Sequence, residues 1–255
     1  MKMRIHLLQE LAKSGTTFTV PDIIKKTSIP REILWVLLSR LEKQGKIERV
    51  EKGKYMVIPL GSEKGKYTLN EFVLGSLLVH PCIISYWSAL HYHGLTEQIP
   101  LTVFIQTTAR KKKQKLEIFE VPYKIIKIKP EKIFGTETIW IEETNVTITN
   151  KEKTIVDCLD KPKYGGGIVE AIKALKEKNL DFKRIADYAH TMNNSAVTRR
   201  LGYLCEQLDI PINLPTKEIK KYLNKVRNYL PLDPTMPKEG RLDSTWQLII
   251  NWEEL

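Results

Sequence analysis

The chain has 255 residues, 42% of them hydrophobic and 28% charged, a balance typical of folded globular proteins and not of disordered or fibrous ones. It carries a formal net charge of +11, and no stretch approaches the roughly 18 apolar residues that a membrane span needs, so we expect no membrane association. The three cysteines lie far apart without a Cys-x-x-Cys pair, and the N-terminus lacks the apolar core of a signal peptide; both features favour a protein of the reducing cytoplasm without a zinc site.

The positive charge is concentrated at the N-terminus. Residues 1–60 carry 12 Lys and Arg against 6 Asp and Glu, so more than half of the net charge lies in less than a quarter of the chain. Such a concentration predicts contact with a polyanion. The alternative is a lysine-rich surface that only keeps the protein soluble.

Two helices are predicted in the first 27 residues. Apolar residues at helical spacing predict the first one: Ile5, Leu7, Leu8 and Leu11. Thr19 is a suitable N-cap for a second helix that runs to about Thr27. Pro21 is tolerated in the first turn of that helix, and the carboxylate of Asp22 lies where N–H groups lack partners.

A third helix and a hairpin follow the break at residues 28–30. The helix ends at Gln44-Gly45 and buries a leucine face made of Leu34, Leu37, Leu38 and Leu41. Alternating residues at 46–50 and 55–58 then flank a turn in which Gly53 can adopt a positive φ. Three helices followed by a basic hairpin is the order of a winged helix-turn-helix, which we predict for residues 1–60.

In such a fold the third helix lies in the major groove and the hairpin reaches neighbouring phosphates or the minor groove of double-stranded DNA. The predicted DNA-binding residues are Arg31, Trp35, Ser39, Arg40, Lys43, Lys52 and Lys54, with Arg31 and Arg40 as the main contacts of the helix. Trp35 has a second interpretation, packing against the adjoining domain. Winged helices also serve as protein-interaction modules, which is the alternative to DNA binding.

The polar, glycine-bearing stretch at 59–65 is interpreted as a linker, and residues 67–255 as a larger α+β domain. Helices are predicted at 69–79 and 85–92. Five short alternating segments then predict a mostly antiparallel sheet: 102–106, 116–120, 123–128, 138–141 and 146–149. A cluster of helices follows at about 151–160, 167–178, 181–192, 195–208 and 216–229, with a last strand within 244–251.

Three features of this larger domain invite an enzymatic interpretation. His91 and His93 lack a nearby set of carboxylates that would complete a metal site, and Asp157-Cys158 lacks a motif-placed histidine. The run Gly165-Gly-Gly167 precedes a helix but lacks the Lys-Ser/Thr ending of a phosphate-binding loop. We interpret it as a flexible start that lets two helices pack closely. We therefore expect no catalytic residue, no metal and no cofactor.

A basic run lies between two of the predicted strands: Arg110, Lys111, Lys112, Lys113 and Lys115. Such a run is usually a solvated loop. The alternative is a second contact to a polyanion, in a protein that already holds DNA.

Several segments resemble AbiEi-type antitoxins, a family also labelled viral-defence transcriptional regulators. The segments that carry the resemblance are 84–95, 153–160 with 166–171, 200–204 and 232–234, in that order behind the predicted winged helix. No single motif is very specific, and the ordered set is more so.

Members of that family pair with a nucleotidyltransferase-like toxin encoded beside them, repress their own promoter, and offset toxicity without forming a stable complex. The resemblance implies a repressor and antitoxin of a phage-defence toxin–antitoxin system, whose partners are operator DNA and such a toxin. One alternative is a solitary transcriptional regulator whose C-terminal domain senses a ligand or protein. Another is an enzyme that modifies nucleotides or proteins.

Overall fold

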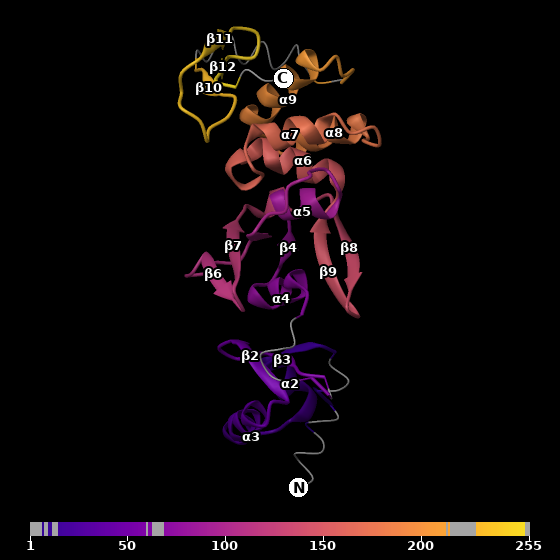
Figure 1. Cartoon of the computed structure of the whole chain (residues 1–255), viewed down its shortest axis with the longest axis vertical. Helices are drawn as coiled ribbons and strands as arrows, with labels where there is room; N and C mark the ends of the chain where they lie inside the picture. The colour runs from indigo at the N-terminus through magenta and orange to yellow at the C-terminus, as the bar shows by residue number, and fades with distance from the viewer. Residues whose placement is uncertain are drawn as a thin grey trace.

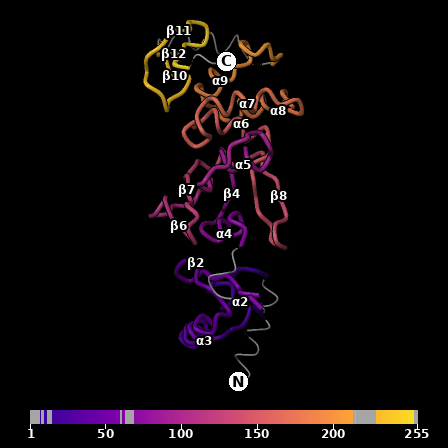
Figure 2. Tube along the Cα trace, viewed as in Figure 1, coloured from indigo at the N-terminus to yellow at the C-terminus, as the bar shows by residue number. Residues whose placement is uncertain are grey.

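The computed structural model of the chain describes residues 7, 10, 11, 15–59, 61–62, 69–212, 214 and 228–252. The elements follow the sequence along the long axis of the molecule (Figure 1): an N-terminal unit lies at one end, a large sheet in the middle, and helices with a small sheet at the other end. The tube view gives the same order (Figure 2). No helix within these described ranges is both long and apolar enough to cross a membrane.

The N-terminal unit is a winged helix-turn-helix, as predicted. Helices α2 (Val20–Thr27) and α3 (Arg31–Lys43) are followed by the hairpin of β2 (Ile47–Glu51) and β3 (Lys54–Val57). A short strand that the sequence did not predict, β1 (Thr17–Thr19), pairs antiparallel with β3. Of the predicted first helix, Leu7, Glu10 and Leu11 are described and helical, whereas Ile5 and Leu8 lie outside the described residues.

Local chemistry explains where these elements begin and end. The hydroxyl of Thr19 accepts the backbone N–H of Asp22 at 3.4 Å, which caps α2. Helix α2 ends at Ser28, whose φ of 53° is left-handed, and Gly53 provides the positive φ of the hairpin turn. Leu34, Leu38 and Leu41 of α3 are buried in a core with Leu7, Leu11 and residues of α2 and the hairpin.

The large sheet has six strands in the order β6-β7-β5-β4-β9-β8. Their bounds are β4 (Ile83–Ile84), β5 (Val103–Thr107), β6 (Lys115–Ile118), β7 (Val121–Lys127), β8 (Thr136–Ile141) and β9 (Thr144–Thr149). Three of the five pairings are antiparallel, while β5 with β7 and β4 with β9 are parallel, so the sheet is mixed. Strand β4 was not predicted, yet this two-residue strand joins the two halves of the sheet.

Helices cover both faces of this sheet. Helix α4 (Glu71–Leu78) packs on one face in a core with Ile84, Ile105, Tyr123 and Ile148. A second core contains α5 (Tyr86–Tyr92), α6 (Lys151–Asp160), α7 (Ile168–Leu175), α8 (Phe182–Thr191) and α9 (Ser195–Gln207), and Ile126 joins it from β7. Two short 3-10 helices, η1 (Pro130–Lys132) and η2 (Pro162–Tyr164), lie in connections. The helix predicted at 216–229 lies almost entirely outside the described residues.

A three-stranded sheet completes the helical cluster, where a single last strand was expected. It consists of β10 (Leu230–Pro231), β11 (Arg241–Asp243) and β12 (Leu248–Ile250), in the order β10-β12-β11. The buried guanidinium of Arg200 in α9 donates hydrogen bonds to the carbonyls of Leu159, Pro231 and Leu232 at 2.7–3.2 Å. One arginine thus ties α6 and β10 to α9.

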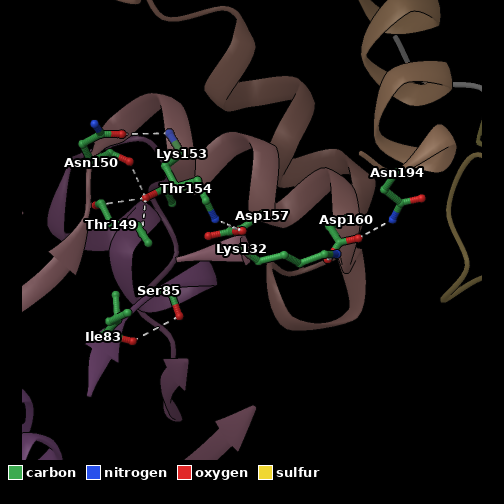
Figure 3. A network of polar contacts seen from close by, with 10 residues as sticks. All are labelled: Ile83, Ser85, Lys132, Thr149, Asn150, Lys153, Thr154, Asp157, Asp160 and Asn194. Carbon is green, nitrogen blue, oxygen red and sulfur yellow. Dashed lines mark hydrogen bonds and ion pairs between the residues drawn. The ribbon is translucent and has the colours of Figure 1, made fainter. Parts of the chain in front are cut away.

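A buried polar network links the sheet to α6 (Figure 3). Asn150 caps α6 by accepting the N–H of Lys153 at 2.9 Å. The side chains of Lys153 and Asp157 form an ion pair that is almost fully shielded from solvent, and the Lys153 ammonium also lies over the ring of Phe134. Burial raises the pKa of Asp157, and Lys153 opposes this effect. Removing one partner of such a pair costs about 3–5 kcal/mol, because the other charge stays buried without compensation.

Candidate nucleic-acid interface

The exposed face of α3 is the first part of the site. With about 100° of rotation per residue, the side opposite the buried leucines carries Glu32, Val36, Ser39, Arg40 and Lys43, all of them exposed or partly so. Three of the predicted DNA contacts thus share one face. Val36, with half of its surface exposed, lies at the centre of this face and was missed by the sequence analysis. Its position opposite the buried leucines was the signal that could have identified it.

A hollow of about 660 Å³ adjoins the N-terminal half of α3. It lies between α2, α3 and the β2–β3 turn, and its lining includes Lys25, Arg31, Trp35, Lys52 and Lys54. The structure therefore brings together four predicted site residues from two separate elements. Lys25 of α2 joins them, although the sequence analysis did not single it out.

Trp35 has a mixed environment. Its indole is half-buried and packs against the core of its own winged helix, and it also lines the hollow. It therefore combines a packing role with access to a ligand in the hollow. The packing partner in the structure is the N-terminal unit itself.

Lys54 and Lys111 differ from the remaining predicted cations because both contact Glu51 and Leu78. Both ammonium groups lie 2.9 Å from the same Oε2 of Glu51, and both donate to the carbonyl of Leu78 at the end of α4, at 2.7 and 2.6 Å. We call these four residues the junction cluster, since it joins the hairpin to the large domain. Burial alone would raise the pKa of Glu51, but the two lysines outweigh it and hold the pKa below its usual value. These two predicted polyanion contacts are thus engaged within the protein.

The remaining predicted cations are available to a ligand. Arg31, Arg40, Lys43 and Lys52 are exposed, and none of their side chains makes a hydrogen bond or ion pair with a residue that the structure describes. Helix α3 leaves Ser39 exposed beside them. This arrangement can bind phosphate oxygens and base edges without breaking any described contact.

The glycine run before α7 has a structural explanation. A Cβ at Gly165 would lie 2.6 Å from the sulfur of Cys158, so the glycine allows α6 to approach closely, as the sequence analysis expected. Asp233 accepts the N–H of Ile168 at 2.8 Å, and a Cβ at Gly167 would lie 2.9 Å from the same carboxylate oxygen. The start of α7 therefore already holds an anion from its own chain.

The other residues with potential chemistry are also used by the fold. Cys158 is fully buried, and burial first, then the charge of Asp157, raises the pKa of its thiol well above the usual range. Nε2 of His93 lies 2.7 Å from the carbonyl of Thr149. Among the residues that the structure describes, no three His, Cys, Asp or Glu side chains are grouped as a metal site would need.

Comparisons with known proteins give a similar fold for the chain and a family match for its N-terminal unit. No curated protein matches the chain. The crystal structure of the RV2827C protein from Mycobacterium tuberculosis is similar, with a TM-score of 0.61 over 95% of this chain and 89% of that one. The identity of 14% limits this likeness to the fold. The segments of the larger domain that resemble AbiEi-type antitoxins remain a prediction, because the family match lies N-terminal to them. Residues 6–58, which contain the winged helix, match the model of a family described as transcriptional regulator, AbiEi antitoxin.

Proposed function

We propose that the chain is a transcriptional repressor that binds operator DNA through residues 1–60, with residues 67–255 as a second functional domain. The observation that carries the proposal is the set of exposed cations on α3 and the β2–β3 turn, which have no described partner, in a unit that matches a family of transcriptional regulators. An α-helix fits the major groove, and the adjoining hairpin then lies beside the phosphates.

The exposed residues of this unit divide into two roles. We assign Arg31, the first residue of α3, to pairing with a guanine edge, and the exposed Val36 to contact with a thymine methyl. Arg40, Lys43 and Lys52 hold phosphates, which positions the helix but carries no sequence information. The hydroxyl of Ser39 can donate a hydrogen bond to either a base edge or a phosphate.

The test compares two arginine substitutions in the full chain. Arg40→Ala should weaken binding to every duplex and lower the slope of affinity against salt by about 1, because one phosphate contact is lost. Arg31→Ala should also relax base preference, by about 1–3 kcal/mol at one position. Selection from randomised duplexes and salt titrations measure both effects. Lys178→Ala, an exposed lysine of the far helical cluster, is the matched control.

Two results would contradict this assignment. Absence of a mobility shift with the full chain at low salt would remove the DNA-binding proposal. An unchanged base preference after Arg31→Ala would remove that residue from base recognition and leave the rest of the interface in place.

We further propose that the chain is the antitoxin of a phage-defence system, that it represses its own operon, and that residues 67–255 counter a nucleotidyltransferase-like toxin without a stable complex. The description of the matching family supports this proposal. So does the size of the second domain: its helical core is separate from that of the winged helix, and its other core, which Val50 and Met56 of the hairpin also enter, consists mainly of its own residues. DNA contact alone does not require them.

Growth of cells that produce the neighbouring toxin from an unrelated promoter tests the antitoxin role. The full chain carrying Arg31→Ala, Arg40→Ala and Lys52→Ala should still rescue growth, because repression cannot act on that promoter. Wild-type protein is the control for rescue. Full toxicity in the presence of soluble, folded protein would instead favour a solitary regulator. An apolar hollow of about 480 Å³ beside α4 and β7, lined by Ile99, Leu101 and Val121, could then serve for sensing.

A further inference from the structure

We infer that residues 110–115, here called the basic loop, form a second contact to the same DNA duplex, through the phosphates that flank the operator. The inference rests on the proposed DNA binding and extends its surface into the larger domain. Three observations carry it: where the loop is anchored, which of its charges are free, and which like charges the sheet places opposite one another.

The basic loop is anchored beside the hairpin of the winged helix. Lys111 lies 2.9 Å from the carboxylate of Glu51, and Glu51 directly precedes Lys52 at the β2–β3 turn. The same ammonium donates to the carbonyl of Leu78 at 2.6 Å. These two contacts place the loop next to a residue that we have assigned to phosphate binding.

Four other cations of the basic loop remain available. Five of its six residues are Lys or Arg, and none is acidic. Arg110, Lys112, Lys113 and Lys115 are exposed, and their side chains have no hydrogen bond or ion pair within the described part of the chain. Of these five cations, Lys111 alone is partly buried, and this burial lowers its pKa.

The pairing of β6 with β7 adds an unfavourable contact between like charges. Lys115 lies directly opposite Lys124 in the antiparallel register, and β6 is the edge strand of the sheet. Like charges at directly opposite positions destabilise a strand pair. An anion bound along this edge relieves the repulsion between the two lysines. A hairpin that faces only water gains no stability from having lysine at both positions.

The arrangement of the cations suits a row of phosphates better than one small anion. In Figure 1, α3, β2 and β6 lie toward the same side of the view and follow one another along the long axis. Duplex DNA carries one negative charge per about 1.7 Å of its axis, so it can meet cations that are spread over several elements. A single phosphate or sulfate would engage one of these groups only.

The experiment compares two triple variants of the full chain with equal change in charge. Arg110→Ala, Lys112→Ala and Lys113→Ala remove the free cations of the basic loop. Lys176→Ala, Lys178→Ala and Lys183→Ala remove three exposed lysines from the distant helical cluster. Affinity is measured against salt concentration on a duplex of about 30 base pairs with the operator at its centre, and on one of about 12 base pairs, close to a single helical turn.

We expect the basic-loop variant to bind the long duplex at least tenfold more weakly and with a salt slope lower by about 2–3, at roughly 0.9 per lost phosphate contact. The control variant should resemble the wild type on both duplexes, and the short duplex should lose little affinity in either variant. Thermal unfolding of each variant should match the wild type, because all six side chains are exposed.

The outcomes separate the inference from the proposed function. If the wild type binds no duplex at low salt, DNA binding itself is refuted, and the inference with it. If the wild type binds but the basic-loop variant equals the control, the second contact is refuted and the winged helix interface stands. An equal loss on the short and long duplexes would overturn the placement on flanking DNA.

Discussion

Gly202 shows how one residue decides the packing of the helical cluster. It lies in the middle of α9, and Trp246, from the connection between β11 and β12, fills the space beside it. A Cβ at this position would lie 2.1 Å from the indole ring, and both residues are fully or almost fully buried. Helix α9 therefore has glycine, a poor helix former, at this position, because a side chain there would keep the indole ring from packing against the helix backbone.

Gly202→Ala should lower the free energy of unfolding by at least about 1–3 kcal/mol, the usual cost of overpacking a core. Gly75→Ala in α4 is the matched control. Its Cβ would lie 3.2 Å from the flexible end of Ile105, 3.4 Å from the ring of Tyr123 and 3.6 Å from the end of Ile84, and the gain in helix propensity of about 0.5–1 kcal/mol offsets these contacts. Denaturant unfolding of both variants measures the difference. Equal stability of the two would show that the ring can move away from α9.

At the scale of elements, the junction cluster connects the winged helix to the larger domain. Val50 and Met56 of the hairpin also pack into the core that α4 forms on the sheet. Glu51 supplies the one carboxylate that both Lys54 and Lys111 approach. Its pKa is lowered in the folded protein, so the folded state favours its charged form.

The stabilisation by Glu51 should be present above its unfolded pKa of about 4.5 and be lost as the pH falls through the lower, folded value. Glu51→Gln should therefore cost about 1 kcal/mol near pH 7, where part of the effect is screened because Glu51 is not fully buried. The difference from the wild type should shrink toward zero in acid. Glu177→Gln, at an exposed position in the helical cluster, should give a small difference at every pH.

Denaturation curves between pH 7 and pH 3 measure this dependence. The free energies of unfolding of Glu51→Gln and the wild type could instead differ by the same amount at every pH in this range. The charge of Glu51 would then contribute nothing beyond the hydrogen-bond geometry, which glutamine can partly keep.

At the scale of the whole molecule, the sequence predicted elements that are set by local chemistry. Helix α6 begins and ends where predicted, because the Asn150 cap lies next to its first residue. The winged helix-turn-helix was equally predictable, since the leucine face of α3 and the glycine of the hairpin turn are local signals. Strands β4, β10 and β11 were missed because they have only two or three residues, too few for an alternating pattern, and β4 also depends on pairing with β9, far away in the chain.

The exposure of the proposed site residues was predictable to a similar extent. Charge and helical spacing identified Arg31, Arg40 and Lys43, whose exposure depends on α3 alone. The position of Lys54 was not predictable, because it depends on contact with Leu78, 24 residues further on. Lys111 contacts Glu51, which lies 60 residues earlier in the chain, and no local sequence pattern indicates such a pairing.

The docking of Trp246 against α9 also bears on the order in which the protein folds as it is made. The core of the winged helix is drawn from residues 7 to 55, so it is complete once the first quarter of the chain has left the ribosome. The helical cluster must wait for a side chain almost 200 residues later, which takes about 10–40 s at ordinary rates of synthesis. Helix α9 is itself made late in this interval, and its apolar surface around Gly202 stays uncovered until Trp246 follows 44 residues later. The unit proposed to bind DNA can thus fold before the larger domain is complete, and the nascent chain is then most exposed to chaperones and proteases at α9.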